Sequence, residues 1–159
     1  MTPRSRHRAM REDIELRDVT ADNWHAVVAL ELDPAQEDLV ATNAESLDDA
    51  KSDPDARPRA VYAGEQVVGF LMYDIYQRRD KSRRASIYRF MIDRNHQGKG
   101  YGRAALGKAL DELRSVPGLR KISIRYMPAN PVAKPFYGSF GFVEVGTDED
   151  GEMVAELAL

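Results

Sequence analysis

The chain has 159 residues, of which 43% are hydrophobic and none is cysteine, and its formal net charge at pH 7 is −3. This length suits one domain with one sizeable core. The lack of cysteine excludes disulfides and thiolate chemistry, and the acidic balance argues against a general nucleic-acid binder. The longest apolar run, Val67 to Tyr73, is too short to span a membrane. We expect a cytoplasmic enzyme domain over 12–159, after a basic flexible tail over 1–11 that lacks a signal-peptide apolar core.

Hydrophobic periodicity and turn residues predict a chain in which strands and amphipathic helices are mixed. In chain order we expect a strand near 14–16, a helix over 24–30, a helical stretch over 33–50, a loop over 51–58, a hairpin of 59–63 and 66–76, a strand over 86–93, a helix from Tyr101 to Leu113, a strand over 121–126, a short helix over 132–140 and closing strands over 142–146 and 153–157. This pattern shows no repeat and no second domain, and it indicates a mixed α/β class.

One segment predicts a binding site for a phosphorylated ligand. Residues 86–93 read as a strand, and from Tyr101 onward apolar residues fall at helical spacing. Between them lie three alternating glycines and two cationic residues: Gly98, Gly100, Gly102, Lys99 and Arg103. The first turn of a helix has unpaired N–H groups and the positive end of the dipole, and glycine lets a phosphate approach them. The expected ligand is therefore a phosphorylated cofactor.

Three phosphate motifs compete for this segment. A P-loop pattern runs from Gly102 to Lys108, but Ala109 replaces the Ser or Thr that Mg²⁺ needs and the match lies inside the helix, so we reject it. A dinucleotide pattern, G-x-G-x-x-A from Gly100, lacks the acidic residue expected at the end of the next strand. The third pattern, Q-x-x-G-x-G, begins at Gln97 and is complete.

The Q-x-x-G-x-G pattern resembles the acetyl-CoA pyrophosphate loop of the GNAT N-acetyltransferase superfamily. A second motif, about thirty residues downstream, resembles that superfamily's N-x-x-A-x-x-F-Y-x-x-x-G-F helix and turn; its members here are Asn130, Ala133, Phe136, Tyr137, Gly141 and Phe142. Two motifs in the right order are far more specific than either alone. The resemblance covers nearly the whole chain and, through residues 36–47, 69–73 and 90–102, looks most like the bacterial diamine and spermidine N-acetyltransferase branch.

The resemblance implies a fold and a cofactor. The fold would be a single domain with a central, mostly antiparallel sheet of roughly six to seven strands, splayed at the middle and flanked by about four helices. The co-substrate would be acetyl-CoA, with its pyrophosphate on the glycine segment and its acetyl oxygen and pantetheine on backbone amides of the preceding strand. The cofactor-binding residues so implied are Phe90, Met91, Ile92, Gln97, Gly98, Lys99, Gly100, Tyr101, Gly102, Arg103, Asn130 and Phe136.

Acetyl transfer to an amine requires an acid that protonates the leaving thiolate, and Tyr137 aligns with the superfamily's usual acid. A phenol has a pKa of about 10 and a thiol about 8.5, so a tyrosine is a weak acid that can still supply the proton. Asn130 would cap the helix of Tyr137 and bond the pantetheine amide. Pro135 lies inside that helix, where it removes a donor and crowds a carbonyl, so the helix starts late or bends.

The base that deprotonates the amine stays open. In some polyamine acetyltransferases a glutamate near the start of the splayed strand serves, but this chain has Tyr88-Arg89 there. The candidates for the base are Glu31, Asp33 and Asp74. The candidates for acceptor binding are Glu31, Asp33, Gln36, Glu37 and Asp74. His7, His25 and His96 have no metal-ligand spacing, so we expect no metal.

Two charged regions give opposite indications about the acceptor. The early helical region is acidic and favours a cationic polyamine, whereas Arg78 to Arg84 form a basic turn that selects an acidic acceptor or only solvates a loop tip. We expect direct attack in a ternary complex by a small primary amine, polyamine or diamine first. An amino acid or a peptide amine is the alternative, and a non-catalytic acyl-CoA sensor or a nucleic-acid module are rivals from other classes. We expect no nucleic-acid or membrane partner, and an exposed edge strand is compatible with a homodimer.

Overall fold

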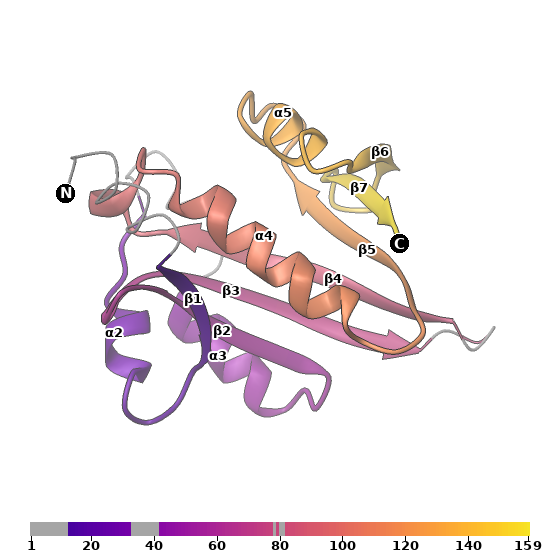
Figure 1. Ribbon diagram of the computed structural model, residues 1–159. Coiled ribbons are helices and arrows are strands. Elements are labelled where there is room, and N and C mark those ends of the chain that lie inside the picture. The colour runs from indigo at the N-terminus through magenta and orange to yellow at the C-terminus, as the bar shows by residue number, and fades with distance from the viewer. Residues whose placement is uncertain (1–12, 33–41, 78, 80–81) are drawn as a thin grey trace. The chain divides into compact units, whose positions relative to one another are not determined.

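The computed structural model describes residues 13–32, 42–77, 79 and 82–159. Its elements are β1 (Ile14–Asp18), α2 (Trp24–Val28), α3 (Asn43–Lys51), β2 (Ala56–Ala63), β3 (Gln66–Gln77), β4 (Arg83–Ile92), the 3-10 turn η2 (Arg94–His96), α4 (Tyr101–Arg114), β5 (Leu119–Tyr126), α5 (Ala133–Gly138), β6 (Val143–Thr147) and β7 (Met153–Ala158). The strands form one seven-stranded sheet in the order β1-β2-β3-β4-β5-β7-β6 (Figure 1). Because β4 and β5 are parallel while β1–β2, β5–β7 and β6–β7 are antiparallel, the sheet is mixed, which confirms the predicted fold class.

The chain forms two compact units. The first unit comprises Met1–Met72 and Arg89–Glu112, and the second comprises Tyr73–Tyr88 and Leu113–Leu159. Strands β3 and β4 each contribute residues to both units. Among the described residues, no helix is long and apolar enough to cross a membrane.

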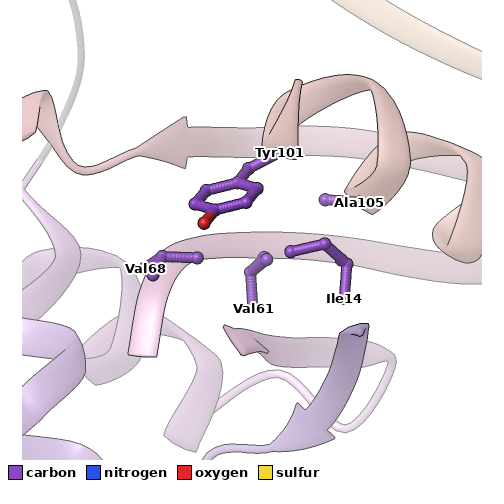
Figure 2. Packing of buried hydrophobic residues seen from close by; sticks show 5 residues of the cluster. All are labelled: Ile14, Val61, Val68, Tyr101 and Ala105. Carbon is purple, nitrogen blue, oxygen red and sulfur yellow. The ribbon is translucent and has the colours of Figure 1, made fainter. Parts of the chain in front are cut away.

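The core of the first unit joins the start of α4 to three strands. Tyr101 and Ala105 of α4 pack against Ile14 of β1, Val61 of β2 and Val68 of β3 (Figure 2). All except Tyr101 are fully buried, and Tyr101 is only 7% exposed. The apolar residues of α4 recur at helical spacing, so one face of the helix enters the core while the opposite face is exposed. This packing fixes the residue at which α4 begins.

The second unit is built around β5. Ile122, Ile124 and Tyr126 are buried and alternate with more exposed residues, as the sequence predicted for a half-buried strand. β5 pairs with β7 from Lys121↔Ala158 to Tyr126↔Met153, and β6 completes this edge of the sheet with a register shift between Glu144 and Gly146. The loop from β5 to β6 contains α5, which carries the second sequence motif.

The predicted loop over 51–58 is wrong at its end, because β2 already begins at Ala56 and contains Pro58. A proline is tolerated there since the β1–β2 pairing ends at Asp18↔Arg59, so β1 needs no N–H from residue 58. The helix predicted over 24–30 ends earlier, at Val28. The N–H groups of Ala29 and Leu30 donate to the carbonyls of His25 and Val27, so they close the last turn and do not extend the helix. Of the stretch predicted over 33–50, the described helix is Asn43–Lys51, and 33–41 lie outside the described residues.

Candidate active site

The strand that precedes the glycine segment leaves its parallel neighbour before it ends. β4 pairs with β5 from Arg83↔Leu119 to Ile87↔Ile124, whereas β4 continues to Ile92. The described pairs with β5 therefore lie in the first half of β4, and the end of β4 leads into the glycine segment. The side chains of Phe90 and Ile92 pack on the first unit's core, so any role of these residues toward a ligand falls to their backbone.

The glycine loop, residues 97–102, has a conformation that only glycine adopts readily. Gly98 has φ 78° and Gly100 has φ 83°, and a Cβ on either would meet no atom within 4 Å. Glycine is therefore required here by backbone conformation and not by crowding. Residues 97–100 are exposed, and the Gly100 carbonyl accepts the first bond of α4 from the Ala104 N–H at 3.2 Å. The loop thus presents its amides at the N-terminus of a fourteen-residue helix.

Side chains on either side hold the glycine loop in place. Tyr101 inserts into the core, and Gly102 lies so close to β4 that a Cβ there would be 3.7 Å from Ile92 and 3.9 Å from Phe90. The Gln97 side-chain amide donates to the Ile92 carbonyl at 3.0 Å, so the first residue of the motif closes the loop back on the strand. Arg103 is exposed on the first turn of α4, and the Lys99 ammonium lies 6.0 Å from the centre of the Tyr101 ring.

Asp93 is a support of this loop that sequence reasoning missed. Its carboxylate accepts the Glu31 N–H at 2.8 Å and the Asn95 N–H at 3.1 Å, and its own N–H donates to the Val68 carbonyl at 2.8 Å. The Arg94 N–H also donates to the Glu31 carbonyl at 2.8 Å. Asp93 is only 8% exposed, and it joins three segments of the first unit just before the loop. An Asp directly before a short helical turn was a usable signal for the bond to Asn95, whereas the bond to Glu31 has no local signal.

Tyr137 lies in an aromatic cluster of the second unit. Its ring stacks on Tyr126 with a centroid distance of 5.7 Å and an interplanar angle of 13°, and it meets Phe136 and Phe142 edge-on at 5.1 and 6.0 Å. Burial raises the pKa of Tyr137 to about 12. Within the described part of the chain its hydroxyl makes no hydrogen bond. The phenol is therefore protonated at neutral pH and has a proton to donate.

The helix of Tyr137 starts late, and this resolves the difficulty raised by Pro135. α5 begins at Ala133, so Pro135 is its third residue, where a backbone N–H has no partner within the helix in any case. The Asn130 side-chain oxygen accepts the N–H groups of Val132 at 3.0 Å and Ala133 at 3.2 Å, so Asn130 bonds to the first turn of α5 although the N-cap position itself is Val132. Asn130 and Pro135 together define the start of a short helix and leave Tyr137 near its end.

Tyr126 and Glu144 form a second feature that sequence reasoning missed. The Tyr126 hydroxyl donates to Glu144 Oε1 at 2.7 Å, and Lys134 Nζ lies 3.7 Å from Glu144 Oε2. Burial first, and then the hydrogen bond and the charge of Glu144, raise the pKa of Tyr126 to about 12. No local pattern joins these residues, because they come from β5, α5 and β6. Only the β5–β7–β6 order brings them together.

The acceptor candidates are described only in part. Asp33, Gln36 and Glu37 lie outside the described residues. Glu31 is exposed in the first unit, and its carboxylate lies 3.4 Å from Arg94 Nε. Asp74 belongs to the second unit, and its Oδ1 is shielded from solvent. The structure therefore does not assemble a complete acceptor site from these residues.

Two further expectations of the sequence bear on this region. Arg89 donates from Nε to the buried Ser46 hydroxyl at 2.9 Å. No group of three or more His, Cys, Asp or Glu that could hold a metal is found within the described ranges.

The predicted cofactor residues fall into two sets, each brought together within one unit. The first unit holds the end of β4 and the glycine loop with the start of α4, that is Phe90, Met91, Ile92, Gln97, Gly98, Lys99, Gly100, Tyr101, Gly102 and Arg103. The second unit holds Asn130, Phe136 and Tyr137. Chemically, the first set offers amides for an anion and the second a phenol for proton transfer.

Comparisons with known proteins place this arrangement in a family. Residues 19–142 match the model of the acetyltransferase (GNAT) family. The chain is 32% identical, over 91% of its length and 99% of the relative, to the probable spermine N(1)-acetyltransferase of Bacillus subtilis subsp. natto and also to the spermine/spermidine N(1)-acetyltransferase of Bacillus subtilis strain 168. The structure resembles that of PaiA N-acetyltransferase from Thermoplasma acidophilum in complex with coenzyme A, with a TM-score of 0.70, 17% identity and coverage of 92% and 99% of the two chains.

The seven-stranded mixed sheet and the glycine loop at the start of α4 agree with this family match. The chain belongs to the GNAT family and is an acetyl-CoA-dependent N-acetyltransferase.

Proposed function

We propose that the protein transfers the acetyl group of acetyl-CoA to a primary amine of a polyamine, spermine or spermidine first, by direct attack in a ternary complex. The use of acetyl-CoA is supported chiefly by the glycine loop at the start of α4, in which Gly98 and Gly100 have positive φ. The choice of a polyamine as acceptor is supported by 32% identity to Bacillus spermine and spermidine acetyltransferases over nearly the full length of both chains.

The cofactor's pyrophosphate would be bound by the amides of the glycine loop, with Lys99 and Arg103 adding positive charge at its rim. Both side chains are exposed, so their contribution falls with salt. The amides carry the binding because their direction is set by Gly98 and Gly100 and by the anchoring of Tyr101. Asn130 has its side-chain oxygen occupied by two amides, which leaves its NH₂ group for the pantetheine.

The transfer step forms a C–N bond and breaks the C–S bond. The amine nitrogen attacks the thioester carbonyl, whose developing negative charge would be stabilised by backbone N–H groups at the end of β4. Tyr137 donates its phenolic proton to the sulfur as the C–S bond breaks, and the attacking nitrogen loses a proton to a carboxylate or to water. A pKa of about 12 for Tyr137 lies well above that of a thiol, about 8.5, so proton transfer to the sulfur is uphill by itself and is coupled to the breaking of the C–S bond; the resulting phenoxide then regains a proton from solvent.

Incubation of the protein with acetyl-CoA and a panel of amines, with thiol release followed in time, tests this function. Spermine and spermidine should give the highest kcat/KM, and the KM for spermidine should rise with salt because exposed charges are screened over about 10 Å at 0.1 M. Glutamate, a free amino-acid mixture and a peptide with a free N-terminus serve as the comparison acceptors. Thiol release only with an acidic amine or the peptide would contradict the polyamine proposal. If no amine gives thiol release, the proposed transfer is contradicted and a non-catalytic CoA-binding sensor becomes the favoured function.

A further inference from the structure

The ring of Tyr126 is the flat surface against which Tyr137 lies. The two rings are close to parallel at 13°, with centroids 5.7 Å apart, and Tyr126 is only 8% exposed. Stacked aromatic pairs of this kind contribute about 0.5–1.5 kcal/mol beyond burial and set the orientation of both rings. Both residues lie in the second unit.

The orientation of Tyr126 is fixed in turn at its far end. Its hydroxyl donates to Glu144 at 2.7 Å, within the range of charge-assisted bonds, which are about twice as strong as neutral ones. Glu144 is half-buried and is also paired with Lys134, whose own side chain is largely exposed. The Tyr126 ring is therefore held by its packing on one side and by a carboxylate at its hydroxyl.

α5 alone is too short to orient a catalytic side chain. It has six residues, contains Pro135, and ends one residue after Tyr137. Helices of this length are not stable by themselves, so the position of Tyr137 depends on tertiary contacts. The Tyr137 ring contacts three other rings. Phe136 is on the same short helix and Phe142 comes five residues after Tyr137, whereas Tyr126 belongs to the sheet.

We propose that Tyr126 and Glu144 are positioning residues for acetyl transfer: the ring of Tyr126, held through its hydroxyl by Glu144, sets the direction in which the Tyr137 phenol points. The proposal rests on the proposed function, in which Tyr137 is the acid. Tyr126 and Glu144 act through Tyr137 and need not touch either substrate. Removing them should lower kcat and leave CoA binding unchanged.

Two pairs of variants separate the contribution of the Tyr126 ring from that of its hydrogen bond to Glu144. Tyr126→Phe keeps the stacked ring and loses the bond to Glu144, so kcat should fall a few-fold. Tyr126→Leu removes the stack and should cost about 10- to 10²-fold, the range expected when a catalytic group shifts by about 1 Å. Glu144→Gln retains an oxygen that accepts from Tyr126 and should stay within about threefold of the parent, whereas Glu144→Leu should match or exceed the loss in Tyr126→Phe.

The deciding experiment is a double-mutant cycle with Tyr137→Phe, because residues that act as a unit are not additive. If Tyr126 acts through Tyr137, then Tyr126→Leu should change kcat by less than twofold once Tyr137 is already Phe. Tyr62→Phe is the matched control: its hydroxyl also has one hydrogen-bond partner, Asn23, but lies in the first unit, and its kcat should equal that of the parent.

The outcomes keep the two proposals apart. A Tyr137→Phe variant within twofold of the parent overturns the role of Tyr137 and with it this inference. A large loss in Tyr137→Phe, combined with losses from Tyr126→Leu that simply multiply in the double variant, overturns the positioning role alone. If Tyr126→Leu does not fold by circular dichroism, the same cycle run with Glu144→Leu and Glu144→Gln decides the question.

Discussion

The glycine loop and the aromatic cluster around Tyr137 are built in opposite ways. In the loop the proposed functional groups are backbone amides, and side chains such as Tyr101, Gln97 and Asp93 hold the backbone. In the cluster the proposed functional group is a single phenol, that of Tyr137; its ring stacks on Tyr126, whose hydroxyl donates to Glu144.

This difference determines what substitutions do. A change of side chain in the loop matters where the backbone conformation depends on it, most directly at Gly98 and Gly100 and also at the residues that hold the loop, Tyr101, Gln97 and Asp93. A change in the cluster matters through the one hydroxyl and its orientation. Affinity for the cofactor and the rate of transfer should therefore be separable, with the loop controlling the first and the cluster the second.

Tyr137→Phe should produce the largest effect. Loss of a general acid typically lowers the rate by about 10²–10⁴-fold, so kcat with acetyl-CoA and spermidine should fall by that factor. The ring and its stacking on Tyr126 are kept, so the melting temperature should change little. Steady-state kinetics decides this, and a kcat within twofold of the parent would make Tyr137 a packing residue.

Gly100→Asp should weaken CoA binding on the order of 10²-fold. A side chain at φ 83° costs roughly 1–2 kcal/mol of backbone strain, and the new carboxylate would repel the pyrophosphate. Gly151→Asp is the matched control, because Gly151 has φ 81°, is exposed and also has no atom within 4 Å of a Cβ, yet lies outside the loop. Calorimetry that finds equal CoA affinity in the two variants would remove the loop from the cofactor site.

Asp93→Ala should combine a stability loss with a smaller affinity loss. The variant leaves the N–H groups of Glu31 and Asn95 without their acceptor, and a hydrogen bond to a charged group contributes about 1.5–3 kcal/mol. Urea unfolding should show a decrease of about 2 kcal/mol, and CoA should bind several-fold more weakly while kcat at saturation is kept. Asp53→Ala, which loses one exposed turn bond to Asp55, is the control and should change neither quantity. A fall in kcat at saturating substrates would contradict the assignment of Asp93 to loop support alone.

The smallest effect expected is on stability at alkaline pH. The pKa values of Tyr126 and Tyr137 are raised to about 12 in the folded protein, against about 10 in the unfolded chain. Between pH 10 and 12 the unfolded state loses these protons first, so the free energy of unfolding should fall as pH rises through this window. Urea unfolding at pH 9, 10 and 11 should show a steeper decline for the parent than for the double variant Tyr126→Phe/Tyr137→Phe. Equal declines would show that neither phenol is buried in solution.

The sequence predicted the loop more completely than the cluster, and for a physical reason. Glycine spacing next to a helical pattern indicates a loop open to a ligand, so this segment and the start of α4 at Tyr101 were predicted, whereas the positive φ of Gly98 and Gly100 was not. Asn130 and Tyr137 were predicted together because they share one local motif, and their roles stay predictions. Tyr126 and Glu144 were not, since their partnership depends on the pairing of β5 and β6 with β7. The start of β2 was missed because Pro58 was interpreted as a loop residue. The sequence does not show that the pairing with β1 ends at Arg59, which is why a proline is tolerated at position 58.

The CoA affinity of Tyr137→Phe, measured by calorimetry beside the parent, most directly tests the division between a loop that binds and a cluster that transfers. The account predicts a Kd within twofold of the parent in a variant whose kcat has fallen by at least about 10²-fold. A loss of CoA affinity of tenfold or more, in step with the loss of kcat, would contradict it, because Tyr137 would then belong to cofactor binding and not to the transfer of the proton.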